Sequence, residues 1–166
     1  MAIEDLGPAE RFAAGAIGPP GRRAFYLEVT ASGTTHSFPC EKGQVAELSE
    51  QGLQLLINAG LAPDQEAVQR LVESGLAVSD PGEPRFRIGS IGLGITASEF
   101  LTMNLGSVDG DDSVNFIVSP EQFQAMAVVS LDVVAAGRPI CPRCGLPEDP
   151  EGHECPSVNG HRSPQA

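Results

Sequence analysis

Hydrophobic and polar positions along the first half of the chain follow two periods. Residues 23–30, RAFYLEVT, and residues 34–38 carry β-forming side chains in partial alternation, and the ASG triplet at 31–33 is typical of a turn, so we predict a β-hairpin. Apolar side chains then recur at helical spacing. This pattern predicts a helix from about residue 41 to 59 and a second from about residue 63 to 74.

The second half of the chain repeats this outline. Three strands are expected at residues 86–95, 101–108 and 113–118. The helix that follows has the clearest start signal, because Ser119 and Gln122 form an S-x-x-Q capping box around Pro120 at the first helical position. Gly137 ends it. In the earlier helix Gly43 and Gly52 are unfavourable, each by about 1 kcal/mol relative to alanine.

These elements predict an α+β fold: an antiparallel sheet from two strand-hairpin-helix units with helices on one face, plus a small C-terminal zinc knuckle. The units, 23–78 and 85–137, are joined by the linker SDPGEP at 79–84. A weak duplication explains their likeness, and so does chance recurrence of a common unit. The expected organisation is an extended arm over 1–22, the α+β domain over 23–137, the knuckle over 138–162, and disordered residues 163–166.

Composition and charge limit the partners. The chain has 166 residues, of which 41% are apolar, and a formal net charge of −12. Such a charge repels polyanions, so we expect no binding to nucleic acid or to anionic membranes. The first residues, MAIEDLGPAERF, lack the apolar segment of a secretory signal, and no run approaches 18 apolar residues. The expectation is a cytoplasmic protein.

The tail CPRCGLPEDPEGHECPSVNGH (141–161) holds candidate metal ligands. Cys141 and Cys144 have the C-x-x-C spacing of a zinc knuckle, and Cys155 follows across a turn-rich loop. With one histidine they form a Cys₃His set, whose thiolates favour Zn²⁺. Spacing favours His153 as the fourth ligand, and His161 is the alternative. Four protein ligands leave no open position, so the predicted role is structural.

Other interpretations of the tail compete with this one. A disulfide is the main competitor to the metal. Nucleic-acid binding through the knuckle would need basic neighbours, yet the arginines of the tail are offset by more numerous acids: Arg138, Arg143 and Arg162 against Glu148, Asp149, Glu151 and Glu154.

The chain also resembles a known family. It is similar to an uncharacterised family, chiefly of high-GC Gram-positive bacteria, defined as a domain of unknown function. The resemblance covers nearly the whole chain and rests on DLGP (5–8), RF (11–12), GPPGRRAFYLE (18–28), EKGQVAEL (41–48), FRIGSIGLG (86–94), VVAAGRPICPRCG (133–145) and DPEGHECPSVNGHR (149–162). It implies a Cys-Cys-His-Cys tail at Cys141, Cys144, His153 and Cys155, and no catalytic residues. ITASEFLTMNL (95–105) is more apolar than the charged hairpin of the family.

Three further motifs have weaker functional interpretations. Cys40 precedes a helix and His36 lies four residues back, which makes a Cys–His nucleophile conceivable, although a buried free cysteine is commoner. DGDD (109–112) lacks the spacing of a calcium loop and favours a solvated turn. GSIGLG (89–94) has the wrong spacing for a phosphate loop, so close packing or strand distortion explains its glycines better.

Two functional hypotheses follow. The first is a non-enzymatic, zinc-stabilised binding or adaptor protein that takes a protein or small-molecule partner. The second is a hydrolase or transferase with its site on the sheet near the glycine-rich strand 86–95. The second requires a deep cleft with convergent polar groups and shifted pKa values.

Overall fold

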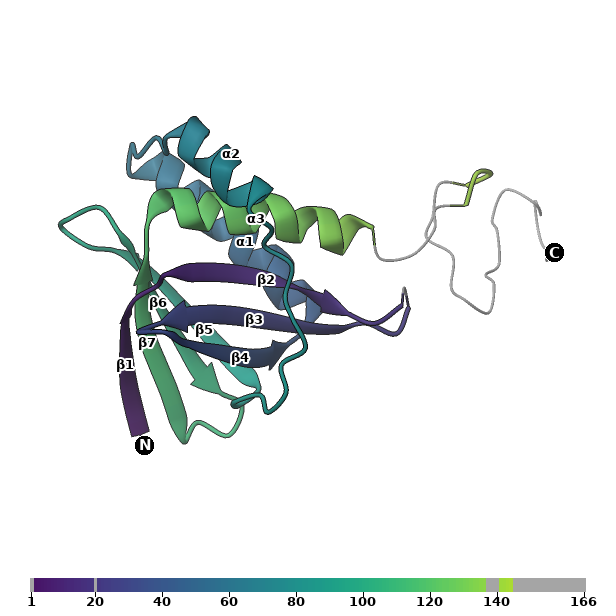
Figure 1. The fold of residues 1–166 in the computed structure, drawn as a ribbon, viewed down its shortest axis with the longest axis horizontal. Coiled ribbons are helices and arrows are strands. Elements are labelled where there is room, and N and C mark those ends of the chain that lie inside the picture. The colour runs from purple at the N-terminus through teal and green to yellow at the C-terminus, as the bar shows by residue number, and fades with distance from the viewer. Residues whose placement is uncertain (1, 20, 137–140, 145–166) are drawn as a thin grey trace.

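The computed structural model describes residues 2–19, 21–136 and 141–144 (Figure 1). The strands in these ranges are β1 (Ala2–Pro8), β2 (Arg11–Ile17), β3 (Ala24–Ala31), β4 (Thr34–Cys40), β5 (Ile88–Ile95), β6 (Leu101–Ser107) and β7 (Asp112–Val118). The helices are α1 (Lys42–Asn58), α2 (Gln65–Glu73) and α3 (Pro120–Ala135). None of these helices is both long and apolar enough to cross a membrane.

The strands form two sheets. One sheet has the order β1-β7-β6-β5, with β1 parallel to β7, and the other is an antiparallel sheet of order β2-β3-β4. The α+β class is therefore confirmed, but the expected single antiparallel sheet is wrong. Residue periodicity identifies strands, whereas it carries no information on which strands pair, and the parallel partner of β7 comes from the far end of the chain.

Each half is a three-stranded meander followed by a helix. β2, β3 and β4 lead into α1, and β5, β6 and β7 lead into α3. The predicted unit 23–78 begins after β2, so it contains only β3 and β4 of the first meander, and the common origin of the units 23–78 and 85–137 stays a prediction.

The extended arm predicted over residues 1–22 contains β1 and β2. Neither strand was predicted. The sequence of β2 is RFAAGAI, and alanine and glycine are poor β-formers. The small residues are present because β2 is covered on both faces. Ala14 packs in the main core, and Ala13 packs in a second cluster with Val68, Leu76 and Ala125. The GAIGPPG stretch does provide a turn, with Gly18 and Gly21 at positive φ.

The three predicted helices are confirmed to within about two residues. In α3 the hydroxyl of Ser119 accepts from the backbone N–H of Gln122 at 3.0 Å, and the Gln122 side chain accepts from the backbone N–H of Ser119 at 2.8 Å. This is the predicted capping box. Figure 1 shows the helices gathered on one side of the strands, with α3 running along β2.

The main core joins both sheets to α1 and α3. Phe12 of β2 lies between the ring of Phe116 on β7, at 5.6 Å between centroids, and that of Phe123 on α3, at 6.3 Å. All three rings are buried. Because one aromatic cluster ties the two sheets to a helix, the described part of the chain folds around a shared core.

The segment between α2 and β5 crosses the outer face of the β2-β3-β4 sheet (Figure 1). We call residues 76–85 the strap. Val78 packs against Gly15 of β2, and the backbone N–H of Arg85 donates to the carbonyl of Ser37 on β4 at 2.8 Å. The SDPGEP stretch read as a linker is thus the part of the strap that covers β3 and β4.

Candidate functional site: a polar pocket under the strap

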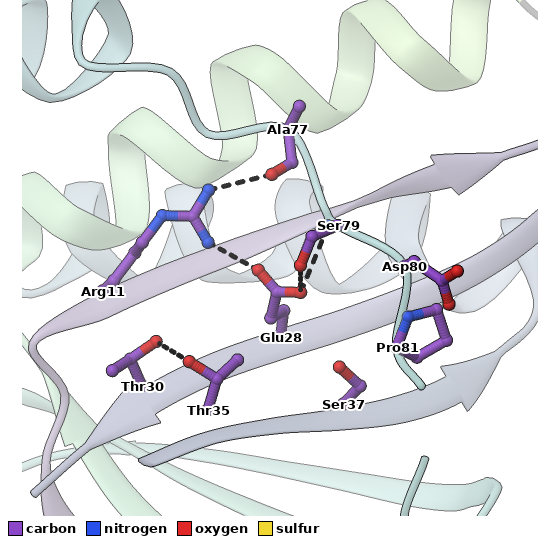
Figure 2. Close-up of a pocket in the computed structure, with 9 residues that line it drawn as sticks. All are labelled: Arg11, Glu28, Thr30, Thr35, Ser37, Ala77, Ser79, Asp80 and Pro81. Atoms are coloured by element: carbon purple, nitrogen blue, oxygen red, sulfur yellow. Dashed lines mark hydrogen bonds and ion pairs between the residues drawn. The ribbon is translucent and has the colours of Figure 1, made fainter. Parts of the chain in front are cut away.

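Strand register places a row of polar side chains on the outer face of the β2-β3-β4 sheet. Arg11 pairs with Thr30, which pairs with Thr35, and the neighbouring row pairs Glu28 with Ser37. Side chains alternate along a strand, so these five share one face while their neighbours point into the core. Figure 2 shows them on the side of the sheet where the strap lies.

A buried ion pair fastens the strap to this face. Arg11 Nη1 donates to Glu28 Oε1 at 2.6 Å, and the Glu28 side chain is only 3% exposed. Glu28 Oε2 accepts from the hydroxyl of Ser79 at 3.0 Å and from its backbone N–H at 3.3 Å. Arg11 Nη2 also donates to the carbonyl of Ala77 at 2.9 Å. A buried carboxylate needs such compensation, and here the strap supplies part of it.

The pocket beside this pair has a volume of about 350 Å³. Its lining is mostly polar and comes from the sheet and the strap: Arg11, Glu28, Thr30, Thr35, Ser37, Ala77, Ser79, Asp80 and Pro81 (Figure 2). The hydroxyls of Thr30 and Thr35 bond to each other at 2.8 Å. Ser37 is 7% exposed, and its hydroxyl bonds to no group in the part of the chain that the structure describes. A buried hydroxyl without a partner is rare, so the pocket holds an open hydrogen-bonding position.

Sequence reasoning missed this pocket. One signal was available: Glu28 lies inside AFYLEVTA, where its neighbours Leu27 and Val29 are buried. A carboxylate in such a strand needs a cation or several donors opposite. Nothing in the sequence indicated that Arg11 and the strap provide them.

The predicted metal ligands are only partly within the described residues. Cys141 and Cys144 lie in a short turn, where Cys141 is buried and Cys144 is partly exposed. His153, Cys155 and His161 lie outside the described residues. Within the described ranges no three His, Cys, Asp or Glu side chains gather as a metal site would require. The zinc site stays a prediction.

The structure argues against a Cys40–His36 nucleophile. Burial raises the pKa of the Cys40 thiol to about 12, so the thiol stays protonated. His36 points to the same side of β4, but Phe38 lies between, and four residues of strand span about 13 Å. The Nδ1 atom of His36 lies 3.2 Å from Arg85 Nη1 instead. Cys40 belongs to the core, in agreement with the expectation that a free cysteine is more commonly buried than nucleophilic.

His36 gives the fold a sensitivity to acid. Burial and the nearby Arg85 lower the pKa of His36 below its ordinary value of 6.5, while Glu4 opposes this weakly. The unfolded chain therefore binds this proton at higher pH than the folded chain does. Above pH 6.5 the contribution of His36 to the free energy of unfolding is fully present. This contribution is lost as the pH falls towards the pKa of His36 in the folded state. We expect His36→Gln to lose less stability than the wild type between about pH 7.5 and 5.5 in urea unfolding. Equal losses would contradict this assignment.

The glycine-rich strand β5 is shaped by close packing. A Cβ on Gly89 would lie 2.7 Å from Cα of Val108, and the register shifts between Ile88 and Ser90. Strand distortion therefore explains Gly89, as expected. A groove of about 150 Å³ runs between this strand and α1, lined by Gln44, Glu47, Leu48, Gln51, Gly89, Ser90, Ile91 and Leu93. Among the residues that the structure describes, the groups with shifted pKa values are His36, Cys40 and Asp109, and they lie outside this groove.

The acidic DGDD stretch is a hairpin turn between β6 and β7. Asp109 Oδ1 accepts from the Ser107 hydroxyl at 2.6 Å and from the backbone N–H of Asp111 at 3.0 Å. These bonds lower the pKa of Asp109. The carboxylate stabilises the turn, in line with the solvated-turn interpretation.

Comparisons with known proteins add a family and no activity. A family model described as "Protein of unknown function (DUF3090)" matches residues 5–155. No curated protein matches the chain, and no solved structure does.

Proposed function

The chain belongs to the DUF3090 family of proteins of unknown function, and we propose from its structure that it is a non-enzymatic binding protein that holds a small ligand under the strap. One observation carries this proposal. Ser37 presents a buried hydroxyl, which has no partner among the described residues, to a pocket of about 350 Å³ beside the buried carboxylate of Glu28. Ligand sites combine such a concave space with a few fixed polar groups.

The chemistry of the pocket supports binding over catalysis. Its lining, within the described residues, includes serine and threonine hydroxyls but no histidine or lysine that could act as the adjacent base such a nucleophile needs. The Glu28 carboxylate is already engaged by Arg11 and Ser79. Groups that are fixed in this way orient a ligand, while the hydroxyls offer its hydrogen bonds.

Equilibrium dialysis against a defined mixture of sugars, amino acids, nucleosides and organic acids tests the proposal. The wild type is expected to retain at least one compound that Ser37→Leu, which fills the pocket, does not retain. Thr34→Leu is the control, because Thr34 lies on the opposite face of β4. Identical retention by all three proteins contradicts the proposal. Conversion of the retained compound into a product would favour the hydrolase or transferase alternative.

A structural Zn²⁺ in the tail is the second part of the proposal. The C-x-x-C spacing, the turn at residues 141–144 and the burial of Cys141 suit the first two thiolate ligands. Cys155 and His153 would complete the set, with His161 as the alternative to His153. Bound zinc would supply folding free energy to a segment too short for its own core.

Metal analysis tests the zinc site. Protein purified without added zinc is expected to carry about one equivalent, because a structural Cys₃His site binds tightly. Cys141→Ser should lose most of it and keep the melting temperature of the α+β domain. His153→Ala and His161→Ala identify the fourth ligand by which one lowers zinc content. Less than about half an equivalent in the wild type, with reactive or oxidised thiols, contradicts the site.

A further inference from the structure

We propose that the ligand of the pocket is a small, neutral, polyhydroxylated molecule of the monosaccharide or sugar-alcohol class. This inference rests on the proposed function, since it assigns a chemistry to the same pocket. Three features of the lining lead to it: its charge, its hydroxyl groups and its size.

The charge of the lining disfavours anions and does not require a cation. Arg11 is the single cation among the described lining residues, and its guanidinium is engaged by Glu28 at 2.6 Å and by the carbonyls of Gly75 and Ala77. Asp80 adds a second carboxylate, whose Oδ1 accepts from the backbone N–H of Gly82. A phosphate or carboxylate would be repelled by these carboxylates and by the protein's net charge of −12. Arg11 neutralises Glu28, and Asp80 keeps one negative charge, so the lining tolerates an ammonium group without depending on one.

The hydroxyl groups match a ligand that both donates and accepts. The pocket gathers hydroxyls from two neighbouring strands and the strap: Thr30, Thr35, Ser37 and Ser79. A hydroxyl has one donor and two acceptor positions, and a polyol presents the same set. The Thr30–Thr35 pair uses one donor and leaves the other, and no hydrogen bond among the described residues occupies the Ser37 hydroxyl. An apolar ligand would cover these groups without hydrogen bonds, which costs about 1–3 kcal/mol for each buried group.

The size of the pocket sets the scale of the ligand. A volume of about 350 Å³ lies near the lower end of small-molecule sites, which span roughly 300–1,000 Å³. Ala77 and Pro81 add apolar surface from the strap, against which the C–H face of a sugar ring can pack. One ring with several hydroxyls therefore fits better than a nucleotide or a peptide.

Isothermal titration calorimetry with the full chain tests this inference. The probes are glucose, galactose, mannose, fructose and sorbitol, with glucosamine, glucose 6-phosphate and cyclohexanol as comparisons. At least one neutral probe is expected to bind with a Kd below about 10 mM, and its phosphate or monohydroxyl counterpart is expected to bind about tenfold more weakly, while the amine, which the Asp80 carboxylate tolerates, is expected to bind within about threefold of the neutral probe. Ser37→Ala and Thr35→Val should each weaken binding about two- to tenfold, the effect of one lost hydrogen bond. Thr34→Val, on the opposite face of β4, should leave the Kd unchanged.

The possible results separate this inference from the proposed function. If no neutral probe binds, or if the best neutral probe binds equally well to Ser37→Ala and Thr35→Val, the assignment of a polyol is overturned. If dialysis still finds another compound that Ser37→Leu fails to retain, the pocket remains a ligand site of different chemistry. If dialysis finds no such compound either, the proposed function fails as well.

Discussion

Replacing Gly52 by alanine is expected to lower the free energy of unfolding by about 2–3 kcal/mol, although alanine favours a helix. Gly52 lies in the middle of α1, and a Cβ at this position would come within 1.9 Å of Cζ and 2.2 Å of Cε1 of Phe123 on α3. The Phe123 ring is fully buried. To remove the overlap the ring or the helix must move by more than an ångström in a close-packed core. Urea unfolding of both proteins measures the difference.

Gly43 supplies the matched control in the same helix. A Cβ there would meet no atom within 4 Å, so Gly43→Ala should be neutral or stabilise by up to about 1 kcal/mol. The double variant Gly52→Ala with Phe123→Leu should recover part of the stability lost by Gly52→Ala, because it shortens the side chain that the new methyl group meets. If Gly52→Ala is as stable as the wild type, the α1–α3 contact is looser than the structure shows.

Gly52 also shows where sequence reasoning reaches its limit. Both glycines of α1 looked like the same local defect, since helix propensity is a property of one residue and its neighbours in the chain. The structure separates them: Gly43 faces open space, and Gly52 allows the close approach of Phe123. The helix itself was predicted well because its apolar spacing and its ends are local signals.

The strands show the same division between local and distant information. β3, β4, β5, β6 and β7 were predicted from strand-forming stretches bounded by turn residues. β1 and β2 were missed, since β1 depends on a parallel partner more than a hundred residues away, and β2 uses alanines to accommodate packing on both faces. Burial on both faces removes the alternation that identifies a half-exposed strand.

The candidate site depends still more on long-range contacts. Its central pair joins Arg11 to Glu28, and the strap reaches Glu28 from Ser79, 51 residues further along the chain. Because the residues of the site come from three different strands and the strap, they form no motif that could be recognised in the sequence. The tail cysteines are the opposite case, because all their proposed partners lie within a short stretch and the spacing alone carries the prediction.

Replacing Arg11 by methionine is expected to lower the free energy of unfolding by about 3 kcal/mol. The substitution keeps the length and apolar stem of the side chain but leaves the carboxylate of Glu28, only 3% exposed, without its cation. Breaking a buried ion pair at one partner costs about 3–5 kcal/mol, and we expect the lower end because the Arg11 side chain is 33% exposed. The strap also loses the bond from Arg11 to the carbonyl of Ala77. Urea unfolding gives the stability, and hydrogen exchange of the Ser79 amide reports on the strap.

Arg87 provides the control for this ion pair. It bonds to Glu41 at 2.8 Å, but the two side chains are 50% and 73% exposed, so Arg87→Met should cost less than about 1 kcal/mol. A double variant, Arg11→Met with Glu28→Met, should recover much of the loss, since replacing both members of a buried pair by apolar groups is often close to neutral. If Arg11→Met costs no more than Arg87→Met, the Glu28 carboxylate is reached by water and the pocket is more open than its burial indicates. The same result would weaken the case for a ligand site whose polar groups are fixed in advance, because the strap would then lack the anchor that shapes the pocket.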